Sequence, residues 1–558
     1  MKPISSNMFK LTAISAMILS TTSASAALYQ VIEVTPPTTF AFESVYGVAI
    51  QPGNVADDKP LGCFADNNCE SSFKLAGETR LVATHAGQAI DGLSYREEAP
   101  FGIDNGFIYV QDDARDFERY CRSELRYAIC ETWADIRWNI WKKEINGDQT
   151  PNAIAFVEGQ ATPIDETKNV VVNSLTAKAE PIGITLTPGD VTGSRRNSVK
   201  ALVANTSINI IDAGLQTRAW KTDGNYTVGS VAHEKTNNQG NFYTSKGAIW
   251  DSSGTMTEIP WQTTNPERDN RLAQGSLRDV TVKDGHIYAV GYNTFYDDRN
   301  FMQASVSSVK VGESNWITKP VTGATVRENG TGGDQIHSNS LLTSVNKNRI
   351  AIGEAKRSRT ESGALANRLF VVPDIKDPKA SFLNGGIFFA GAGGKAGAIN
   401  NFNEIVGQID TEETREAGGK PRRKRGFIYP YGTEAQGSNP ERQAIFNNRA
   451  WILDDLTNGL AENNQYRIID ATDINDAGVI SATALKCSGG YDSSAHNAQC
   501  GGGKGSEKTV AVKLVPIAGQ TSEDITPRGT EDLVTERNGA GLGVWTLILG
   551  GLLWFRRK

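Results

Sequence analysis

The sequence predicts a mainly β protein: a repeat-built, β-propeller-like body of six to eight blades with a small helical insert. One observation is a short recurring pattern, in which alternating apolar residues flank a turn of Asn, Asp or Gly. Such turns tolerate the positive φ angles of tight hairpins. The other is that further strand-like runs follow the copies, so that each unit supplies about four strands. Such a unit cannot bury both faces alone, and stacking as propeller blades solves that problem.

Four copies of the hairpin pattern begin near residues 279, 343, 397 and 471, and an earlier variant covers Phe101–Val110. The later strand-like runs, which we interpret as outer strands, are Gly247–Asp251, Arg368–Val372, Gly426–Tyr429 and Thr509–Leu514. The spacing of the copies and the length of the chain suit blades with loop insertions. The alternative is a pair of β-sandwich-like domains divided near Gly189–Asn197.

The N-terminus predicts export. Lys2 and Lys10 precede the apolar stretch Leu11–Leu19, and Ala24-Ser25-Ala26 forms an A-x-A cleavage site. This order is typical of a secretory signal peptide, so we expect residues 1–26 to be removed by cleavage after Ala26. A buried N-terminal helix is the alternative, but nothing on the segment is amphipathic.

The C-terminus predicts a membrane segment. Residues 539–555 carry no charge, and Arg556, Arg557 and Lys558 end the chain. The length is marginal for crossing a hydrocarbon core of ~30 Å, and the basic end should stay on the cytoplasmic side. The body would then lie outside the inner membrane, with residues 516–538 as a polar tether. A docked hydrophobic strand or helix is the alternative.

The tail resembles a known sorting signal. A glycine-containing lead with Gly539, Gly541 and Gly543, a short apolar span and a basic end resemble the GlyGly-CTERM tail of Gram-negative secreted proteins. The resemblance implies a rhomboid-like sorting protease as a partner and passage of the body to the surface. The sequence departs from the pattern, because its true Gly-Gly pair, Gly550-Gly551, lies inside the span.

Six cysteines fall into three close pairs: Cys63/Cys69, Cys121/Cys130 and Cys487/Cys500. An even count in an exported chain predicts disulfides. Fifteen pairings exist for six cysteines, and local pairing is the simplest. Metal binding is disfavoured because the sequence has no C-x-x-C motif and few histidines.

Residues 112–145 predict the helical insert, since the segment has no Pro or Gly and is rich in charged and aromatic residues. Across nine residues a continuous helix rises ~13 Å, whereas a disulfide needs Cα atoms within ~7 Å. Either the helix breaks into a hairpin between Cys121 and Cys130, or these two do not pair. We expect Trp133, Trp138 and Trp141 to pack the insert onto the body rather than to form a ligand-stacking platform.

The repeat carries a second resemblance. The segments Ile474–Ile480, Ala398–Gly407 and Trp451–Leu456 resemble units of HAF-type extracellular repeats. From about residue 205 to residue 516 the chain resembles a secreted gammaproteobacterial family of unknown function, in which such repeats accompany a GlyGly-CTERM tail. The resemblance implies export and repeats, and it brings no established activity.

The sequence holds no nucleophile elbow, P-loop, H-E-x-x-H motif or dinucleotide fingerprint. It therefore predicts no catalytic, metal or cofactor residue. Asp473–Gly478 superficially matches a calcium loop, but its twelfth position is Ala484 rather than Glu, so we interpret it as a hairpin turn. Paired acids for glycoside hydrolysis at Glu97-Glu98 or Asp112-Asp113 are disfavoured, because acidic pairs are common in a chain of this length. The basic run 421–425 predicts a solvated loop.

The net charge of -6 disfavours nucleic-acid binding.

We expect a signal peptide (1–26), a β-repeat body (27–515) with its helical insert, a tether and a sorting tail (539–558). The protein would be exported and either anchored in the inner membrane facing the periplasm, or released to the cell surface after tail processing. Its partners would be the export machinery, the membrane and an unidentified surface ligand. The hypothesis is a ligand- or partner-binding or structural envelope protein rather than an enzyme; the alternative is a secreted hydrolase of polysaccharide or peptide with its site in the propeller channel.

Overall fold

The computed structural model describes residues 27–531 except 38–39, 54, 56–58, 70, 83–86, 99–100, 104–105, 111–112, 204–214, 296–298, 325–326, 328–332 and 414–420. The predicted signal peptide lies outside the described residues. So do residues 532–538 of the tether and the whole sorting tail, with Gly539, Gly541, Gly543 and the terminal Arg556, Arg557 and Lys558.

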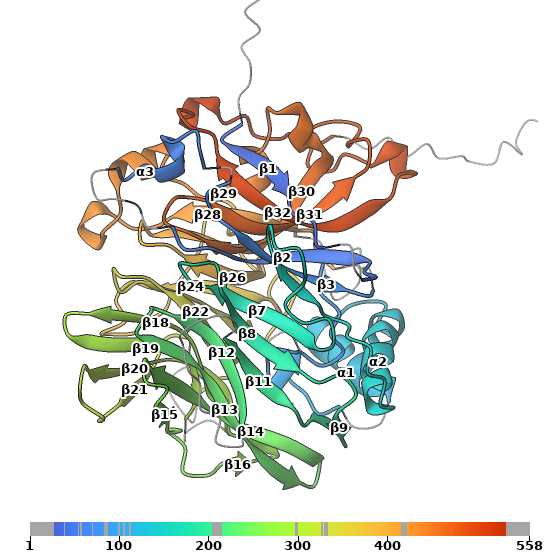
Figure 1. Ribbon diagram of the computed structural model, residues 1–558, viewed down its shortest axis with the longest axis vertical. Helices are drawn as coiled ribbons and strands as arrows, with labels where there is room; N and C mark the ends of the chain where they lie inside the picture. The colour runs from blue at the N-terminus through green and yellow to red at the C-terminus, as the bar shows by residue number, and fades with distance from the viewer. Residues whose placement is uncertain are drawn as a thin grey trace, which may run out of the picture.

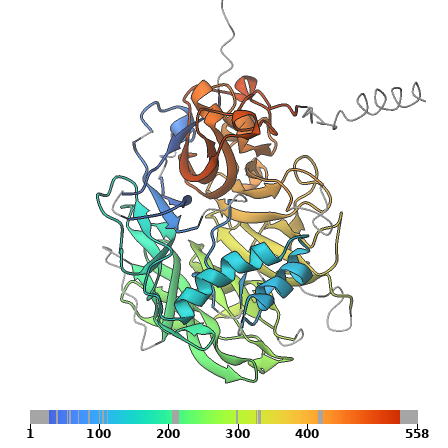
Figure 2. The same ribbon diagram turned by 90° about the vertical axis from the view of Figure 1, so that its right-hand side faces the viewer.

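Seven antiparallel sheets of three or four described strands follow one another around a ring in chain order (Figures 1 and 2). Blade 1 contains β2 (Ser44–Ile50), β3 (Leu75–Arg80) and β6 (Ala155–Val157); blade 2 contains β7 (Asn169–Leu175), β8 (Pro181–Leu186) and β11 (Val199–Val203). Blade 3 contains β12 (Gln216–Thr222), β13 (Tyr226–Asn237), β14 (Gly240–Asp251) and β15 (Met256–Ile259); blade 4 contains β18 (Ser276–Lys283), β19 (His286–Thr294), β20 (Met302–Lys310) and β21 (Ile317–Pro320). The protein is therefore a seven-bladed β-propeller, as predicted, and the alternative of two β-sandwiches is wrong.

The remaining blades complete the ring. Blade 5 contains β22 (His337–Val345), β23 (Ala351–Arg357), β24 (Asn367–Val372) and β25 (Ser381–Phe382); blade 6 contains β26 (Gly394–Ile399), β27 (Glu404–Asp410), β28 (Lys424–Pro430) and β29 (Trp451–Ile452). Blade 7 combines β30 (Tyr466–Ile474), β31 (Ile480–Cys487) and β32 (Glu507–Pro516) with β1 (Tyr29–Glu33), whose register pairs Val31 with Leu514. The N-terminal strand thus closes the ring as the outer strand of the last blade.

Short elements lie between these strands. The small two-stranded sheets are β4 (Phe101–Ile103) with β5 (Gly106–Phe107), β9 (Val191–Thr192) with β10 (Arg195–Arg196), and β16 (Glu267–Arg268) with β17 (Arg271–Leu272). The helices of the body are η1 (Gly62–Phe64), η5 (Glu434–Gln436), α3 (Pro440–Ile445), α4 (Leu453–Leu456), η6 (Ala461–Gln465), η7 (Gly501–Gly503) and η8 (Ser522–Asp524).

The four predicted hairpins are the first two strands of blades 4, 5, 6 and 7. The turn of the last copy is closed by the Gly478 N–H, which donates to the Asn475 carbonyl at 3.1 Å, and this confirms the hairpin expected at Asp473–Gly478. Each of the four later runs lies in the third strand of its blade, at β14, β24, β28 and β32. The variant at Phe101–Val110 is a correction: it forms β4 and β5, a separate small sheet outside the blades.

Every first strand carries a β-bulge, at which one extra residue stands opposite the second strand. The extra residues are Val48, Asn173, Trp220 and Arg278 in blades 1–4, both Ser338 and Thr343 in blade 5, one of Gly397 and Ala398 in blade 6, and both Ile469 and Thr472 in blade 7. In blades 2–6 a glycine of the second strand lies beside the bulge, where a Cβ would be 1.8–2.4 Å from a first-strand carbonyl oxygen. These glycines are Gly183, Gly229, Gly291, Gly353 and Gly407. The glycine that ends the repeat pattern therefore permits the bulge.

Apolar side chains fill the spaces between neighbouring blades. One cluster joins Val290 and Val306 of blade 4 to Leu342 and Phe370 of blade 5. Each sheet buries both faces in this way, as the stacking argument from the sequence requires.

The helical insert belongs to the long connection between β3 and β6 in blade 1, residues 81–154, which we call the roof. It contains α1 (Ala114–Tyr120), η2 (Cys121–Leu125) and α2 (Glu131–Ile145). The helix breaks at Arg126, whose φ is 57°, and Cys121 and Cys130 form a disulfide with a Cα–Cα distance of 5.6 Å. The helical hairpin is thus confirmed, and Figure 2 shows α1 and α2 lying across the face of the ring that is turned toward the viewer.

The other two predicted cysteine pairs are also disulfides. Cys63 and Cys69 have a Cα–Cα distance of 5.7 Å, and Cys487 and Cys500 one of 5.6 Å. All six cysteines are therefore paired locally, which leaves none to hold a metal.

The first part of the predicted tether packs against the body. Arg528 is buried, and its backbone N–H donates to Asp455 at 2.8 Å. Ile525 packs against the core around blade 7. No helix among the described residues is long and apolar enough to cross a membrane, and the segment predicted to do so lies outside them.

Candidate functional site

The first strands of the seven blades converge on a central cavity of about 470 Å³. Its walls include extra residues of the bulges, among them Val48, Asn173, Trp220, Arg278, Thr343 and Thr472. A bulge re-aims a side chain relative to a regular strand. The bulges therefore bring residues of every blade to a common space. The volume of this space falls in the range of ~300–1,000 Å³ typical of small-molecule sites.

Acidic side chains in or beside this wall link four pairs of neighbouring blades. A bulge takes backbone N–H groups out of the ladder, and a buried N–H needs another acceptor. Four carboxylates supply one at 2.8–3.0 Å: Glu78 accepts from Val172, Asp279 from Val345, Glu354 from Ala396, and Asp473 from Ile50. These acids are therefore structural links between blades 1 and 2, 4 and 5, 5 and 6, and 7 and 1.

The roof is fixed over one end of the channel by buried ion pairs. Glu97 accepts two hydrogen bonds from Arg278 of blade 4, at 2.7 and 2.6 Å, and Glu98 accepts one from Arg218 of blade 3 at 3.1 Å. The adjacent acids thus point to different blades and do not form a carboxylate pair of the kind glycosidases use. Asp113 accepts from the Arg115 N–H as the N-cap of α1, and its neighbour Asp112 lies outside the described residues.

The tryptophans of the insert serve packing, as expected. Trp141 is fully buried beneath Arg196, whose guanidinium carbon lies 4.9 Å from the ring centroid. Trp133 lines the cavity, but its ring stacks with Tyr120 and lies 3.8 Å from the guanidinium of Arg137.

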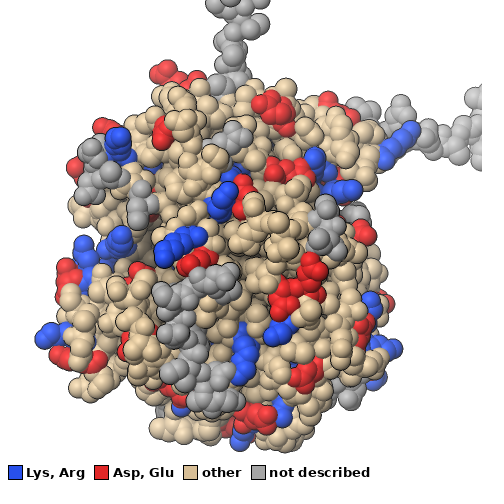
Figure 3. Space-filling view, viewed as in Figure 1, with Lys and Arg blue, Asp and Glu red and all other residues tan. Residues whose placement is uncertain are grey.

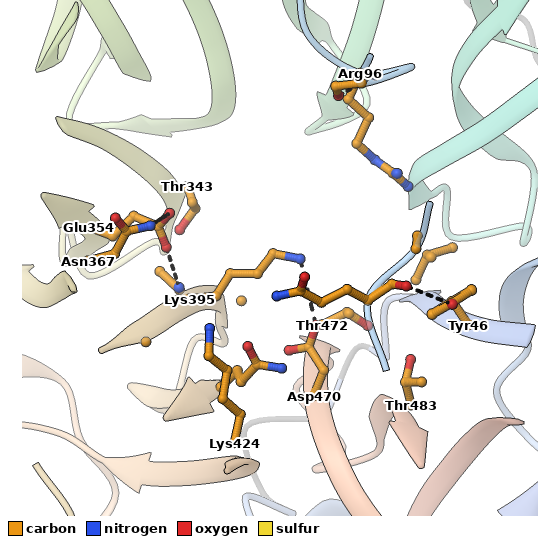
Figure 4. A pocket seen from close by; sticks show the side chains of 18 of the residues that line it. Tyr46, Arg96, Thr343, Glu354, Asn367, Lys395, Lys424, Asp470, Thr472 and Thr483 are labelled. Carbon is orange, nitrogen blue, oxygen red and sulfur yellow. Dashed lines mark hydrogen bonds and ion pairs between the residues drawn. The ribbon is translucent and has the colours of Figure 1, made fainter. Parts of the chain in front are cut away.

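Two lysines of blade 6 reach into the cavity from the side of blades 5–7 (Figure 4). Lys395 lies 3.6 Å from Asp470, and their side chains are 61% and 16% exposed. Lys424 stands directly opposite Asp410 in the register of β27 and β28. Burial raises the pKa of Asp410, although the charge of Lys424 and a hydrogen bond from the Gly393 N–H oppose the rise.

A second charged group lies farther along the channel. The Lys221 ammonium is 3.6 Å from Asp279, and the charges of Asp279 and Asp473 hold its pKa above the usual value despite burial. Burial raises the pKa of Asp473, against the opposing charge of Lys221. In the described part of the chain, no group of three or more His, Cys, Asp and Glu side chains is arranged to hold a metal.

The basic run 421–425 is a correction to the sequence analysis. Arg422 and Arg425 are buried and pair with Asp410 and Asp454 at 3.4 and 2.9 Å, while Lys424 faces the cavity. Only a fold that brings distant acids together could reveal this, so the run looked like a solvated loop. The face shown in Figure 3 has acidic and basic side chains interspersed, without a large patch of one sign.

Of the cavity lysines, the sequence analysis included only Lys424, as part of the basic run 421–425, and it did not single out Lys221 or Lys395. One signal pointed toward the wall: the glycine of each repeat marks the strand next to the bulge, and the bulged residue faces the channel. Which residue of the first strand is the extra one, however, follows only from the pairing register of the two strands.

Comparisons with known proteins concern the family and the fold. A family model described as "Protein of unknown function (DUF3466)" matches residues 211–558, more than half of the chain. No curated protein matches the chain.

Three solved structures resemble it weakly. The β-propeller domain of the Trilobed protease from Pyrococcus furiosus has 9% identity and a TM-score of 0.29, covering 60% of this chain and 84% of that one. Trypanosoma rangeli sialidase has 7% identity and a TM-score of 0.29, covering 87% and 59%. A Cellvibrio cellulosa α-L-arabinanase mutant has 9% identity and a TM-score of 0.23, covering 46% and 88%. These values carry no argument about activity.

Proposed function

The chain belongs to the DUF3466 family of proteins of unknown function, and on that premise we propose that it is an exported binding protein that holds a small polar ligand in its roofed central cavity. The observation that carries the proposal is the cavity itself, about 470 Å³ in volume and lined by polar side chains from every blade. Concave sites of this size with a few convergent polar groups are the usual place of small-molecule binding.

Several features support export and anchoring. The first 26 residues have the pattern of a signal peptide, and the three disulfides suit an oxidising compartment. The tail resembles a GlyGly-CTERM signal, which implies a rhomboid-like protease. The body would face the periplasm from the inner membrane, or reach the cell surface after the tail is processed. A purely structural envelope role would leave the cavity without purpose.

Ligand-induced stabilisation tests the binding function. We would measure the melting temperature of the purified protein against a panel of neutral and charged sugars, organic acids and amino acids. Thr343→Tyr should fill the cavity from its wall and remove any shift, whereas Thr264→Tyr, at an exposed position, should keep it. A ligand that binds only the folded protein raises the melting temperature, and the shift grows with the logarithm of the ligand concentration above its Kd. Absence of any shift across the whole panel would contradict the proposal.

One observation favours the alternative, a hydrolase acting in the channel. Asp410 and Asp473 line the cavity with pKa values that burial raises, and such carboxyl groups can donate protons. Turnover of polysaccharide or peptide polymers that is lost in Asp410→Asn and Asp473→Asn but kept in Asp284→Asn, an exposed acid outside the cavity, would support it. Inactivity across broad panels would remove it.

A further inference from the structure

Acids and bases line the cavity in similar numbers, but two of its lysines are more exposed than the carboxylates near them. Lys395 is 61% exposed at its side chain and Lys221 is 33% exposed. The carboxylates are much less accessible: Asp470 is 16% exposed and Asp410 only 1%. A ligand entering the cavity therefore meets ammonium groups before it meets carboxylates.

Most of the acids also have their oxygens engaged. Glu78, Asp279, Glu354 and Asp473 accept the backbone N–H groups that link neighbouring blades. Asp410 accepts from the Gly393 N–H at 2.8 Å and from Arg422 at 3.4 Å. Binding a cation or a rich set of donors would compete with these links, whereas an anion would leave them intact.

The aromatic rings at the cavity offer little surface for stacking a sugar. The guanidinium of Arg278 lies 3.5 Å from the centroid of the Trp220 ring, and that of Arg137 lies 3.8 Å from the Trp133 ring. Tyr120 stacks on Trp133 as well. Neither tryptophan ring is therefore open as a platform, which favours recognition by charge and hydrogen bonds.

We propose that the cavity takes an anionic, hydroxylated small molecule, whose acidic group lies between Lys395 and Lys424 of blade 6. Asp470, 3.6 Å from Lys395, is the counterion that the ligand replaces. The cavity wall also holds four polar side chains, Thr343, Asn367, Gln408 and Thr472. Each already donates a hydrogen bond to another part of the protein, so their contribution to the ligand is to accept from its hydroxyl groups or to exchange these bonds for it. This inference rests on the proposed binding function and names the class of its ligand.

Calorimetric titration of the purified full-length protein tests the inference. The probes are D-glucuronate, its neutral methyl ester, D-glucose and D-glucose 6-phosphate, which separate the anionic charge from the sugar and a carboxylate from a phosphate. We expect at least one anion to bind about tenfold or more tightly than its neutral counterpart. Lys395→Gln and Lys424→Gln should each weaken that anion about tenfold and leave neutral sugars unchanged.

The matched control is Lys310→Gln, an exposed lysine at the end of β20 on the outside of blade 4, which should bind as the wild type does. Raising the salt concentration should weaken binding of the anion to the wild type, and should weaken it much less in a variant that carries both Lys395→Gln and Lys424→Gln. Equal affinity of glucuronate and its ester, or unchanged anion binding in both lysine variants, would overturn the inference while leaving a binding function. Failure of all charged and neutral probes, together with an empty ligand panel, would remove both.

Discussion

Blades 4, 5 and 6 are each one continuous run of four strands, whereas blades 1 and 2 have three strands each and the roof divides blade 1. The family model begins at residue 211, so it covers blades 3–6 and three of the four strands of blade 7, and it leaves blades 1 and 2 outside. Yet both regions have bulged first strands that turn residues into the cavity. Blades 4, 5 and 6 repeat one backbone pattern, whereas blade 1 carries the roof that covers the cavity.

The two regions also differ in what holds them. The regular blades are joined by apolar clusters such as that between blades 4 and 5. The roof is fixed by buried ion pairs, including Glu144 with Arg196, in which both side chains are at most 7% exposed. Apolar packing tolerates small changes of volume, but a buried ion pair fails when one partner is removed. The cover of the cavity should therefore be more sensitive to single polar substitutions than the blades beneath it.

The largest effect is expected where the two regions meet, in blade 7. Val31→Pro removes the N–H that donates to the Asn463 side chain at 3.0 Å and disrupts the strand that closes the ring. We expect a loss of about 4 kcal/mol in the free energy of unfolding, measured by chemical denaturation. Ile317→Pro in β21, the exposed outer strand of blade 4, is the control and should cost much less. Equal losses of unfolding free energy in Val31→Pro and Ile317→Pro would mean that the closing strand contributes no more to stability than an exposed outer strand.

Breaking a roof ion pair should come next. In the wild type the Arg196 guanidinium donates two hydrogen bonds to the Glu144 carboxylate, at 2.8 and 2.9 Å. Glu144→Gln leaves this guanidinium buried without its carboxylate partner. We expect a loss of about 3 kcal/mol by denaturation and faster proteolysis of the roof. Glu118→Gln breaks the exposed pair with Arg122 in the same insert and should cost below about 1 kcal/mol. A small effect of Glu144→Gln would contradict the view that ion pairs hold the roof.

The bulge glycines test what the regions share. In Gly291→Ala of blade 4 and Gly183→Ala of blade 2, the new Cβ would lie 2.0 Å from a carbonyl oxygen of the first strand. Each substitution should cost about 2 kcal/mol in thermal or chemical unfolding, because the backbone must shift. Gly529→Ala, where nothing lies within 4 Å, should be neutral. A loss in blade 4 alone would show that the bulges of the two regions are not equivalent.

Sequence reasoning reached the parts of this molecule that local chemistry determines. The hairpin of blade 4 was predictable because Asp284-Gly285 can turn tightly, and the break near Arg126 followed from the distance a disulfide spans. The roof ion pairs and the closure by β1 join residues far apart in the chain, and the bulges depend on the register within each hairpin. The pair of Tyr466 with Glu33 spans more than four hundred residues, and no local pattern announces it. The cavity depends on the roof, the bulges and the closing strand. The sequence therefore predicted a propeller channel but not which residues line it.

The smallest expected effect concerns that same closing strand at high pH. Tyr466 donates a hydrogen bond to Glu33 of β1 at 3.1 Å, and burial together with the Glu33 charge raises the pKa of Tyr466 to about 12. Between pH 10 and 12 the unfolded chain loses this proton while the folded protein keeps it, so stability falls as pH rises through that window and is fully present below pH 10.

Tyr466→Phe should therefore cost about 1 kcal/mol at pH 8, where the hydrogen bond is lost, and should flatten the decline of stability between pH 10 and 12. The decline will not vanish, because burial also raises the pKa of Tyr46 and of Tyr109 to about 12. Tyr109 belongs to the roof, so Tyr109→Phe gives the matching measurement for the irregular region. Denaturation curves of both variants at a series of pH values would separate the two contributions. Parallel pH profiles for wild type and Tyr466→Phe would mean that this bond does not hold the closing strand, and that the β1–β32 ladder and the contacts of Asn463 suffice.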